Sequence, residues 1–223
     1  MASDDIINIS FHGVGDPLGP PRESGEHDYW IGRDAFLSLL DEVQGRDDVR
    51  LSFDDGNASD VEVALPALVE RGMTAEFFVV AGRLGTPGNV DATGLGALRA
   101  AGMGVGTHGM EHRSWRGLDD DELEVELVEA RQVIAEAVGS AVTAAALPLG
   151  QYDRTVLAAL RRHDYEVVYS SDARRVRHGA WFQPRYSVRA GDTPQSVRET
   201  VLAPPRAHER LRGHLAGIVK RWR

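Results

Sequence analysis

The hydrophobic pattern of this chain alternates between short apolar runs and one-sided repeats. Runs rich in Ile, Val and Phe are typical of strands, and apolar positions recurring every three or four residues indicate helices. The expected strands are 6–11, 49–53, 74–80, 103–107, 141–147, 166–169 and 181–188. The expected helices are 34–43, 59–71, 93–101, 119–138, 154–162 and 194–202.

Regular alternation of strands and helices predicts an α/β fold with a parallel sheet, either open or closed into a barrel. In both arrangements the active site lies at the carboxyl ends of the strands. The segment 13–32, rich in Gly and Pro, separates the first expected strand from the first helix. Because so long a loop is uncommon within a domain, we expect it to form a functional rim.

Two clusters of polar residues follow expected strands. Asp54 and Asp55 come after 49–53, and His108 and His112 come after 103–107. Successive residues leaving a strand point in different directions, so the two carboxylates are expected to do different jobs. One carboxylate with two imidazoles suits a hydrolytic metal, and the other carboxylate is then free to act as a general base.

Each cluster alone is weak, and only their combination carries this interpretation. Asp-Asp-Gly is ordinary turn chemistry, and a His-x3-His pair is often incidental. Together, the sequences SFDDG at 52–56 and THGMEH at 107–112 resemble the first two motifs of the polysaccharide deacetylase (NodB-homology) family, carbohydrate esterase family 4. The third motif, a Pro-aromatic-Gly turn, is matched by ALPLGQYD at 146–153.

The resemblance covers the chain from its first strand to about residue 188, and it departs from the family in three places. Ala146 stands where an Arg is frequent, Leu149 stands where the family has an aromatic residue, and the late Leu-x-His segment is not evident. The fold that the resemblance implies is a distorted (β/α)7 barrel of the polysaccharide deacetylase type. Periodicity alone would not separate that barrel from an open sheet.

The resemblance also implies roles for individual residues. Asp55, His108 and His112 would hold a divalent metal, zinc first and other first-row ions next, and Asp54 would be the general base. Pro148 and Leu149 of the third motif would border the substrate. A backbone N–H group survives a side-chain change, so Leu149 would still stabilise the oxyanion.

Three further residues have two interpretations each. His12 ends the first strand and would be the general acid, as in members with a permuted motif order, or else a structural His. Trp115 would stack on a sugar face or belong to the core. Arg185 would replace the missing motif Arg in orienting Asp54, or would be a plain surface Arg.

Composition limits the class of protein and of site. The 223 residues suit one domain, and no apolar stretch is long enough for a membrane span. Without Cys, only nitrogen and oxygen ligands are available for a metal. A net charge of −9 argues against general nucleic-acid binding. The acidic start lacks the basic and apolar segments of a signal peptide, so we expect a cytoplasmic protein.

Charge is distributed unevenly along the chain. Residues 151–223 hold 15 of the 25 basic residues but only seven acidic ones, which leaves a net charge of −17 on residues 1–150. The segment 206–223 is basic, with apolar residues at helical spacing, namely Leu211, Leu215, Ile218, Val219 and Trp222. We expect a catalytic domain over 1–205 and a terminal helix packed against it. Alternatively, this helix contacts an anionic membrane from the inner face.

The sequence therefore predicts a metal-dependent hydrolase that removes an N-acetyl group from an N-acetylated sugar in a glycan or glycoconjugate intermediate. A second interpretation keeps the metal and changes the bond, giving a deformylase or a hydrolase of a non-sugar amide. A third is a carbohydrate-binding module with a decayed site. The intact carboxylates and imidazoles favour an enzyme, whereas Ala146 and Leu149 slightly favour decay.

Overall fold

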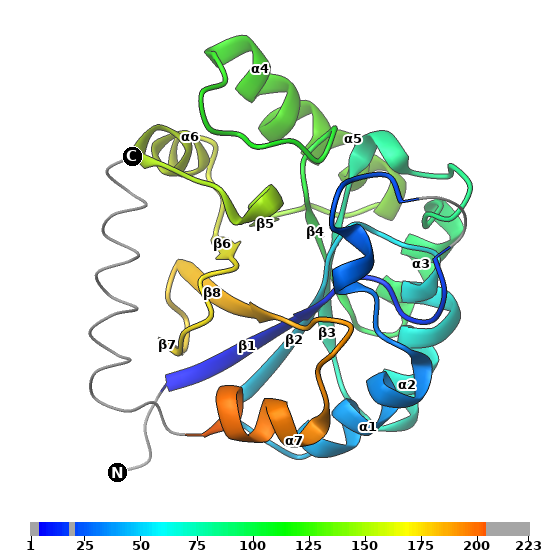
Figure 1. Ribbon diagram of the computed structural model, residues 1–223. Coiled ribbons are helices and arrows are strands. Elements are labelled where there is room, and N and C mark those ends of the chain that lie inside the picture. Colours follow the sequence, from blue (N-terminus) through cyan, green and yellow to red (C-terminus); the bar gives the residue numbers. More distant parts are fainter. Residues whose placement is uncertain (1–4, 18–20, 204–223) are drawn as a thin grey trace.

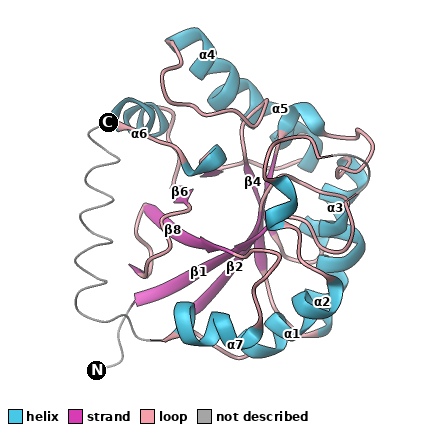
Figure 2. Ribbon diagram, viewed as in Figure 1, coloured by secondary structure: helices cyan, strands magenta, loops and turns pink. Residues whose placement is uncertain are grey.

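The computed structural model describes residues 5–17 and 21–203, and strands at its centre are surrounded by helices (Figures 1 and 2). The strands are β1 (Asp5–Phe11), β2 (Val49–Phe53), β3 (Ala75–Val79), β4 (Gly104–Thr107), β5 (Ala144–Ala146), β6 (Val167–Ser170), β7 (Val176–Arg177) and β8 (Phe182–Ser187). The α-helices are α1 (Arg33–Val43), α2 (Leu65–Glu70), α3 (Ala92–Ala100), α4 (Asp120–Glu124), α5 (Ala130–Val138), α6 (Arg154–Arg162) and α7 (Pro194–Val197).

The parallel strands close on themselves as a barrel. The order β2-β3-β4-β5-β6-β8-β1 returns to β2 through a parallel pairing of β1 with β2, in which Ile7 lies opposite Val49. The short strand β7 adds only an antiparallel pairing at the start of β1. The seven-stranded barrel that the family resemblance implies is therefore confirmed, and an open sheet is excluded.

Short-range signals explain where several helices begin and end. The side chain of Asp91 accepts a hydrogen bond from the backbone of Gly94 at the start of α3, and Asp153 caps α6 in the same way. A capping box between Asp119 and Glu122 begins α4. Each of these residues satisfies backbone N–H groups that a helix start leaves without a partner.

The expected helices 59–71, 119–138 and 194–202 are each partly π-helical. The π-helical turns are η2 (Asp60–Ala64), η4 (Val125–Glu129) and η6 (Arg198–Leu202), and each adjoins an α-helix. Three 3₁₀ turns, η1 (Glu26–Tyr29), η3 (Ala81–Arg83) and η5 (Pro148–Gly150), complete the elements of the described segments. Isolated π-turns often occur at functional sites, and hydrophobic periodicity does not predict them.

The core fills the space between the barrel and its helices. Four Phe rings contact one another within it, with Phe11 stacked on Phe53 at 5.3 Å, Phe53 stacked on Phe77 at 4.7 Å, and Phe36 meeting Phe11 edge-on at 5.1 Å. Phe11 and Phe53 are the last residues of β1 and β2, directly before His12 and Asp54. They therefore give a rigid base to the residues that follow.

The amino end of the barrel holds a cavity of about 320 Å³. Its lining includes Asn8, Arg50, Glu76, Tyr169 and Gln183. It lies at the starts of the strands, opposite the end where the sequence places the chemistry. None of the helices within residues 5–17 and 21–203 has the length and apolarity needed to span a bilayer. The expected helix 206–223 lies outside the described residues.

Candidate metal centre and catalytic residues

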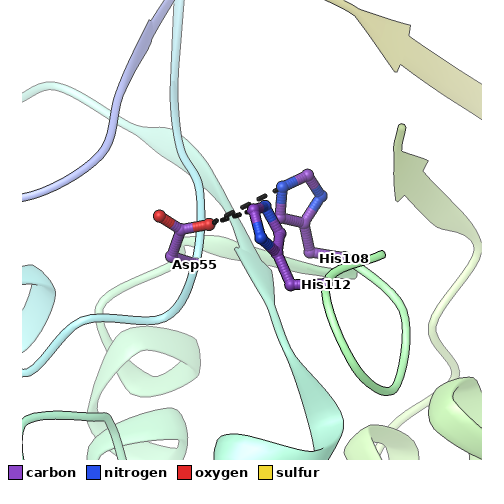
Figure 3. A group of neighbouring side chains, drawn as sticks. All are labelled: Asp55, His108 and His112. Carbon is purple, nitrogen blue, oxygen red and sulfur yellow. Dashed lines mark ion pairs between the residues drawn. The ribbon is translucent and has the colours of Figure 1, made fainter. Parts of the chain in front are cut away.

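Asp55, His108 and His112 converge at the carboxyl ends of β2 and β4 (Figure 3). Asp55 Oδ1 lies 3.3 Å from His112 Nε2 and 3.7 Å from His108 Nε2, and one potential ligand atom of each residue lies within 4.8 Å of the others. Asp55 Oδ1 is buried and accepts no hydrogen bond from the described residues. A buried carboxylate oxygen left in this way, facing two imidazole nitrogens, fits a divalent cation.

The backbone is strained at the same place. Asp55 has φ 77°, His112 has φ 52° and Leu149 has φ 57°, all in the left-handed region that non-glycine residues rarely adopt. Only two other non-glycine residues in the described segments, Asp164 and Ala173, share that feature. Such strain costs of order 1–3 kcal/mol per residue and clusters at functional sites. It aims the carboxylate and the imidazole at one point.

Hydrogen bonds fix the tautomers of both imidazoles. His108 Nδ1 lies 2.9 Å from the backbone oxygen of Ala146, and His112 Nδ1 lies 2.7 Å from a Glu23 carboxylate oxygen. A carbonyl or carboxylate oxygen can only accept, so Nδ1 carries the proton in both rings. Each Nε2 is then an unprotonated nitrogen that faces Asp55, which is the form a metal binds. Burial lowers the pKa of His108 to about 4, which also keeps that ring neutral.

A buried carboxylate organises the loop between the two His residues. Glu126 in η4 is fully buried and accepts hydrogen bonds from the backbone of Met110 at 2.7 Å, from Arg113 Nε at 3.0 Å and from Trp115 Nε1 at 3.2 Å. Gly109 packs so closely that an added Cβ would lie 2.4 Å from Glu126 Oε2. The loop therefore has no room for a side chain at Gly109 and little freedom to move.

Asp54 has different partners from its neighbour. Arg185 of β8 donates to both Asp54 oxygens at 2.6 Å and to Ser52 Oγ at 3.0 Å. Arg185 is 1% exposed, so the interpretation as a surface Arg is wrong, and the expected pairing with Asp54 is present. A two-pronged contact with a planar guanidinium fixes the direction in which the carboxylate points.

The partners of the two carboxylates set their charge. Burial alone would raise the pKa of Asp54, but the Arg185 guanidinium and the His108 imidazole outweigh it and lower the pKa to about 2. Burial likewise acts to raise the pKa of Asp55, and the neighbouring imidazoles lower it below its ordinary value. Both groups are therefore ionised at neutral pH, side by side.

His12 lies beside the Asp54 carboxylate. Its Nε2 is 3.9 Å from Asp54 Oδ2, and its ring packs against Tyr29 with centroids 4.8 Å apart. The buried Nδ1 has no hydrogen-bond partner among the described residues. The ring thus lies just beyond the carboxyl end of β1, with Nε2 facing the Asp54 carboxylate.

The third motif lies at the same end of the barrel. Pro148 is buried in η5, directly after β5, and the Leu149 side chain is 53% exposed. Leu149 therefore presents its side chain to solvent while its strained backbone stays close to the barrel end. Both residues follow Ala146, whose backbone oxygen lies 2.9 Å from His108 Nδ1, and their role at a substrate stays a prediction.

The predicted stacking role of Trp115 is wrong. Its side chain is fully buried, packs in the cluster around Leu123 and Leu127, and donates to Glu126. A buried indole cannot offer a face to a sugar. The alternative interpretation, a core residue, is the one that the structure bears out.

Sequence reasoning missed two carboxylates at this site. Glu126 gave a signal, because it lies at helical spacing among the buried Leu123, Leu127 and Ala130, on a face where a charge is unexpected. Glu23 gave none, since it lies in an irregular loop that only its length marked as a functional rim. Its contact with His112 joins residues 89 positions apart.

Comparison with known proteins assigns a family to this geometry. The family model for polysaccharide deacetylases matches residues 41–168. The polysaccharide deacetylase homologue YxkH of Bacillus subtilis is 20% identical over 172 residues, covering 71% of this chain and 62% of YxkH. The match thus spans less than two thirds of that relative.

Solved structures share the fold at low sequence identity. The Streptococcus pyogenes deacetylase PplD, solved in complex with acetate, superimposes with a TM-score of 0.78 at 18% identity, covering 90% of this chain and 99% of PplD. IcaB from Ammonifex degensii gives 0.72 at 23% identity, covering 90% and 98%. BC0361, a polysaccharide deacetylase from Bacillus cereus, gives 0.76 at 14% identity, covering 88% and 69%.

Proposed function

This chain belongs to the polysaccharide deacetylase family, and from that membership we propose that it is a metal-dependent N-deacetylase. The proposed substrate is an N-acetylated sugar in a glycan or glycoconjugate intermediate, and the products are acetate and a free amine. One observation carries the proposal. The unpartnered oxygen of Asp55 faces two imidazole nitrogens, directly beside an ionised Asp54 that is held by Arg185.

Asp55, His108 and His112 would hold the ion, with zinc expected first because its usual ligands are nitrogen and oxygen atoms of this kind. A divalent ion bound there would lower the pKa of its bound water and polarise the amide carbonyl. Asp54 is a weak base, so it could take a proton from that water only if the pKa of the water were lowered in this way. The residues of the chain fit this ion by their tautomers, their burial and their charge.

Asp54 is proposed as the general base. Its carboxylate is ionised, buried and oriented by Arg185, so it is ready to accept a proton from the attacking water. His12 is proposed as the general acid that protonates the leaving amine. Its Nε2 lies 3.9 Å from Oδ2 of Asp54, the residue next to the proposed metal ligand Asp55.

Leu149 is proposed to stabilise the negative charge that develops on the carbonyl oxygen. Its backbone lies at the barrel mouth in a strained turn, and an N–H group held in this way needs no reorganisation during the reaction. Its exposed side chain and the preceding Pro148 would border the sugar. This arrangement would tolerate the change from an aromatic residue, because the donor belongs to the backbone.

Acetate release from N-acetylglucosamine oligomers tests the function. The protein should release acetate, lose activity after chelation and regain it with zinc. His108→Ala should not regain activity, whereas a matched His178→Ala variant, changed at an exposed residue by the opposite cavity, should behave as the wild type. Absence of acetate release from any N-acetyl sugar by zinc-loaded protein would contradict the proposal. Release of formate from N-formylated substrates instead would favour the deformylase alternative.

From the sequence of the segment 206–223 we also propose where in the cell the enzyme acts. Its basic residues and apolar spacing support a reversible contact between a cytoplasmic enzyme and an anionic membrane that carries a lipid-linked glycan. Co-sedimentation with anionic and neutral vesicles, for the full chain and a chain ending at Pro205, tests it. Binding that survives the truncation, or that ignores salt, would contradict this role.

A further inference from the structure

A carboxylate from the rim loop contacts one metal ligand directly. Glu23 Oε1 lies 2.7 Å from His112 Nδ1, and His112 Nε2 on the other side of the ring lies 3.3 Å from Asp55 Oδ1. Arg83 Nη2 donates to the same Glu23 oxygen at 2.5 Å. The His112 ring therefore lies between two carboxylates. Glu23 accepts a hydrogen bond from its Nδ1, and Asp55, with which it would share a metal, faces its Nε2.

The two imidazoles of the site are held by different means. His108 donates to a backbone oxygen, that of Ala146, which belongs to the barrel. His112 donates to a side chain from a loop more than 80 residues away in the sequence. A substitution can remove the Glu23 side chain but not the backbone oxygen of Ala146. The orientation of His112 can therefore be tested by mutation, whereas that of His108 cannot.

Glu23 acts on the ring and not on the loop that carries it. The loop between the His residues is held by Glu126 through backbone and side-chain contacts that do not involve Glu23. The rim loop is held separately, because Arg22 donates to Asn57 at 2.6 Å and to Asn89 at 2.7 Å. Removing the Glu23 carboxylate therefore leaves both segments with their own supports.

We propose that Glu23 is a positioning residue for the metal centre. Its carboxylate holds the proton of His112 on Nδ1, orients the ring and makes Nε2 a stronger ligand, as second carboxylates do for metal-bound imidazoles elsewhere. The proposal rests on the metal site of the proposed function and adds to it a residue outside the family motifs.

Zinc affinity of the metal-free protein, measured by competition with a chromophoric chelator, tests this role without any use of activity. Glu23→Ala should bind zinc about 10–100-fold more weakly than the wild type. Glu23→Gln should lose less, because its amide oxygen still accepts from Nδ1. Arg83→Gln should show a smaller loss than Glu23→Ala, since it leaves the carboxylate in place.

Asp28→Asn is the matched control, because it removes one negative charge from an exposed residue of the same loop. It should bind zinc as the wild type does, which separates a specific contact from a general loss of charge. Circular dichroism of the metal-free variants identifies any that fail to fold, and Glu23→Gln keeps the test open if Glu23→Ala is one of them.

Cobalt substitution gives a second readout. The visible spectrum of Co²⁺ reports ligand geometry, so Glu23→Ala at saturating cobalt should show a changed spectrum, and Asp28→Asn should not. Wild-type zinc affinity in both Glu23 variants would overturn the proposal. If the wild type binds zinc through His108 and His112 but releases no acetate, the proposed function fails while the role of Glu23 stands.

Discussion

Asp54 and Asp55 are adjacent in the sequence but belong to two differently built halves of the site. The half around Asp54 rests on barrel strands, with Arg185 from β8 and Ser52 from β2. The half around Asp55 rests on loops, with His112 after β4 and Glu23 from the rim. Fully buried partners occur in the first half, whereas Glu23 is partly exposed.

The two halves differ in how far hydrogen bonds within the chain satisfy the carboxylate. Both oxygens of Asp54 are paired, so that carboxylate is held in place by the chain alone. The buried oxygen of Asp55 has no hydrogen-bond donor in the described chain, and two lone-pair nitrogens face it. An unpaired buried charge is costly, so the loop half is the part that a bound cation would stabilise. A carboxylate held rigidly by the chain would suit the proposed base, and a ligand set completed by a metal would suit the proposed activation of water.

The same substitution in each half should give the largest and clearest difference. Asp55→Asn should lose zinc and all measurable turnover, because the ligand set loses its only carboxylate. Asp54→Asn should keep zinc and lose about 10²–10⁴-fold in kcat, because it removes the base and no ligand. Metal content by atomic emission and acetate release measure both. Full zinc content in Asp55→Asn, or near-normal kcat in zinc-loaded Asp54→Asn, would contradict the division.

Replacing Arg185, the partner of Asp54 on β8, should reduce the free energy of unfolding strongly and zinc affinity only slightly. Arg185→Met leaves the Asp54 charge buried without a partner, which costs about 3–5 kcal/mol in the free energy of unfolding. Arg185→Lys keeps a positive charge but not the two-pronged contact, and should recover only part of the loss. Urea unfolding measures both. A loss confined to zinc affinity, with unchanged unfolding, would contradict the assignment of Arg185 to the base half.

The pH dependence of that loss has a definite sign. Asp54 has a folded-state pKa of about 2, below its ordinary value of 3.8, so its pairing stabilises the fold above about pH 4 and that contribution is lost as the pH falls toward 2. The difference between wild type and Arg185→Met should therefore be greatest at neutral pH and shrink on acidification. A difference that grows as the pH falls would contradict the low pKa of Asp54.

His12 offers a smaller effect that depends on the substrate. His12→Ala should keep zinc and lose about 10²-fold in kcat on an amide, the lower end for general acid catalysis. It should lose much less on an activated ester, whose leaving group needs no proton. Tyr29→Leu removes the ring that packs against His12 and should produce a weaker form of the same pattern. Equal losses of His12→Ala on amide and ester would return His12 to a structural role.

The barrel half of this comparison was largely predictable from the sequence. Alternating apolar residues placed the strand at 49–53, and apolar residues at helical spacing placed the helix at 154–162, both with the bounds that the structure gives. The strand 141–147 is reduced to Ala144–Ala146, and the strand Val176–Arg177 was missed, because two residues carry no periodicity. Closure of the sheet came from the family resemblance and not from the pattern.

The site was predictable only where its residues leave strands. Asp54, Asp55, His108 and His112 could be placed because parallel strands end at one edge. The contact of Glu23 with His112 could not, because it depends on the path of an irregular loop. The sequence pattern also could not predict the positive φ of Asp55 and His112, since neither residue type favours that conformation as Gly does.

Trp115 is where sequence reasoning erred, and it gives the smallest expected effect. Proximity to His112 suggested a sugar-binding face, but the buried indole instead donates to Glu126, which also holds the loop between His108 and His112. Trp115→Phe keeps an aromatic ring and removes that hydrogen bond, so the free energy of unfolding should fall by about 1 kcal/mol. KM for N-acetyl sugars should stay unchanged, because no face of the ring meets the substrate. A Leu149→Ala variant, which shortens an exposed side chain and keeps a non-glycine residue at the positive φ, should show the reverse, a raised KM with little change in unfolding. A raised KM in Trp115→Phe with unaltered stability would restore the stacking interpretation and place Trp115 among the substrate-binding residues.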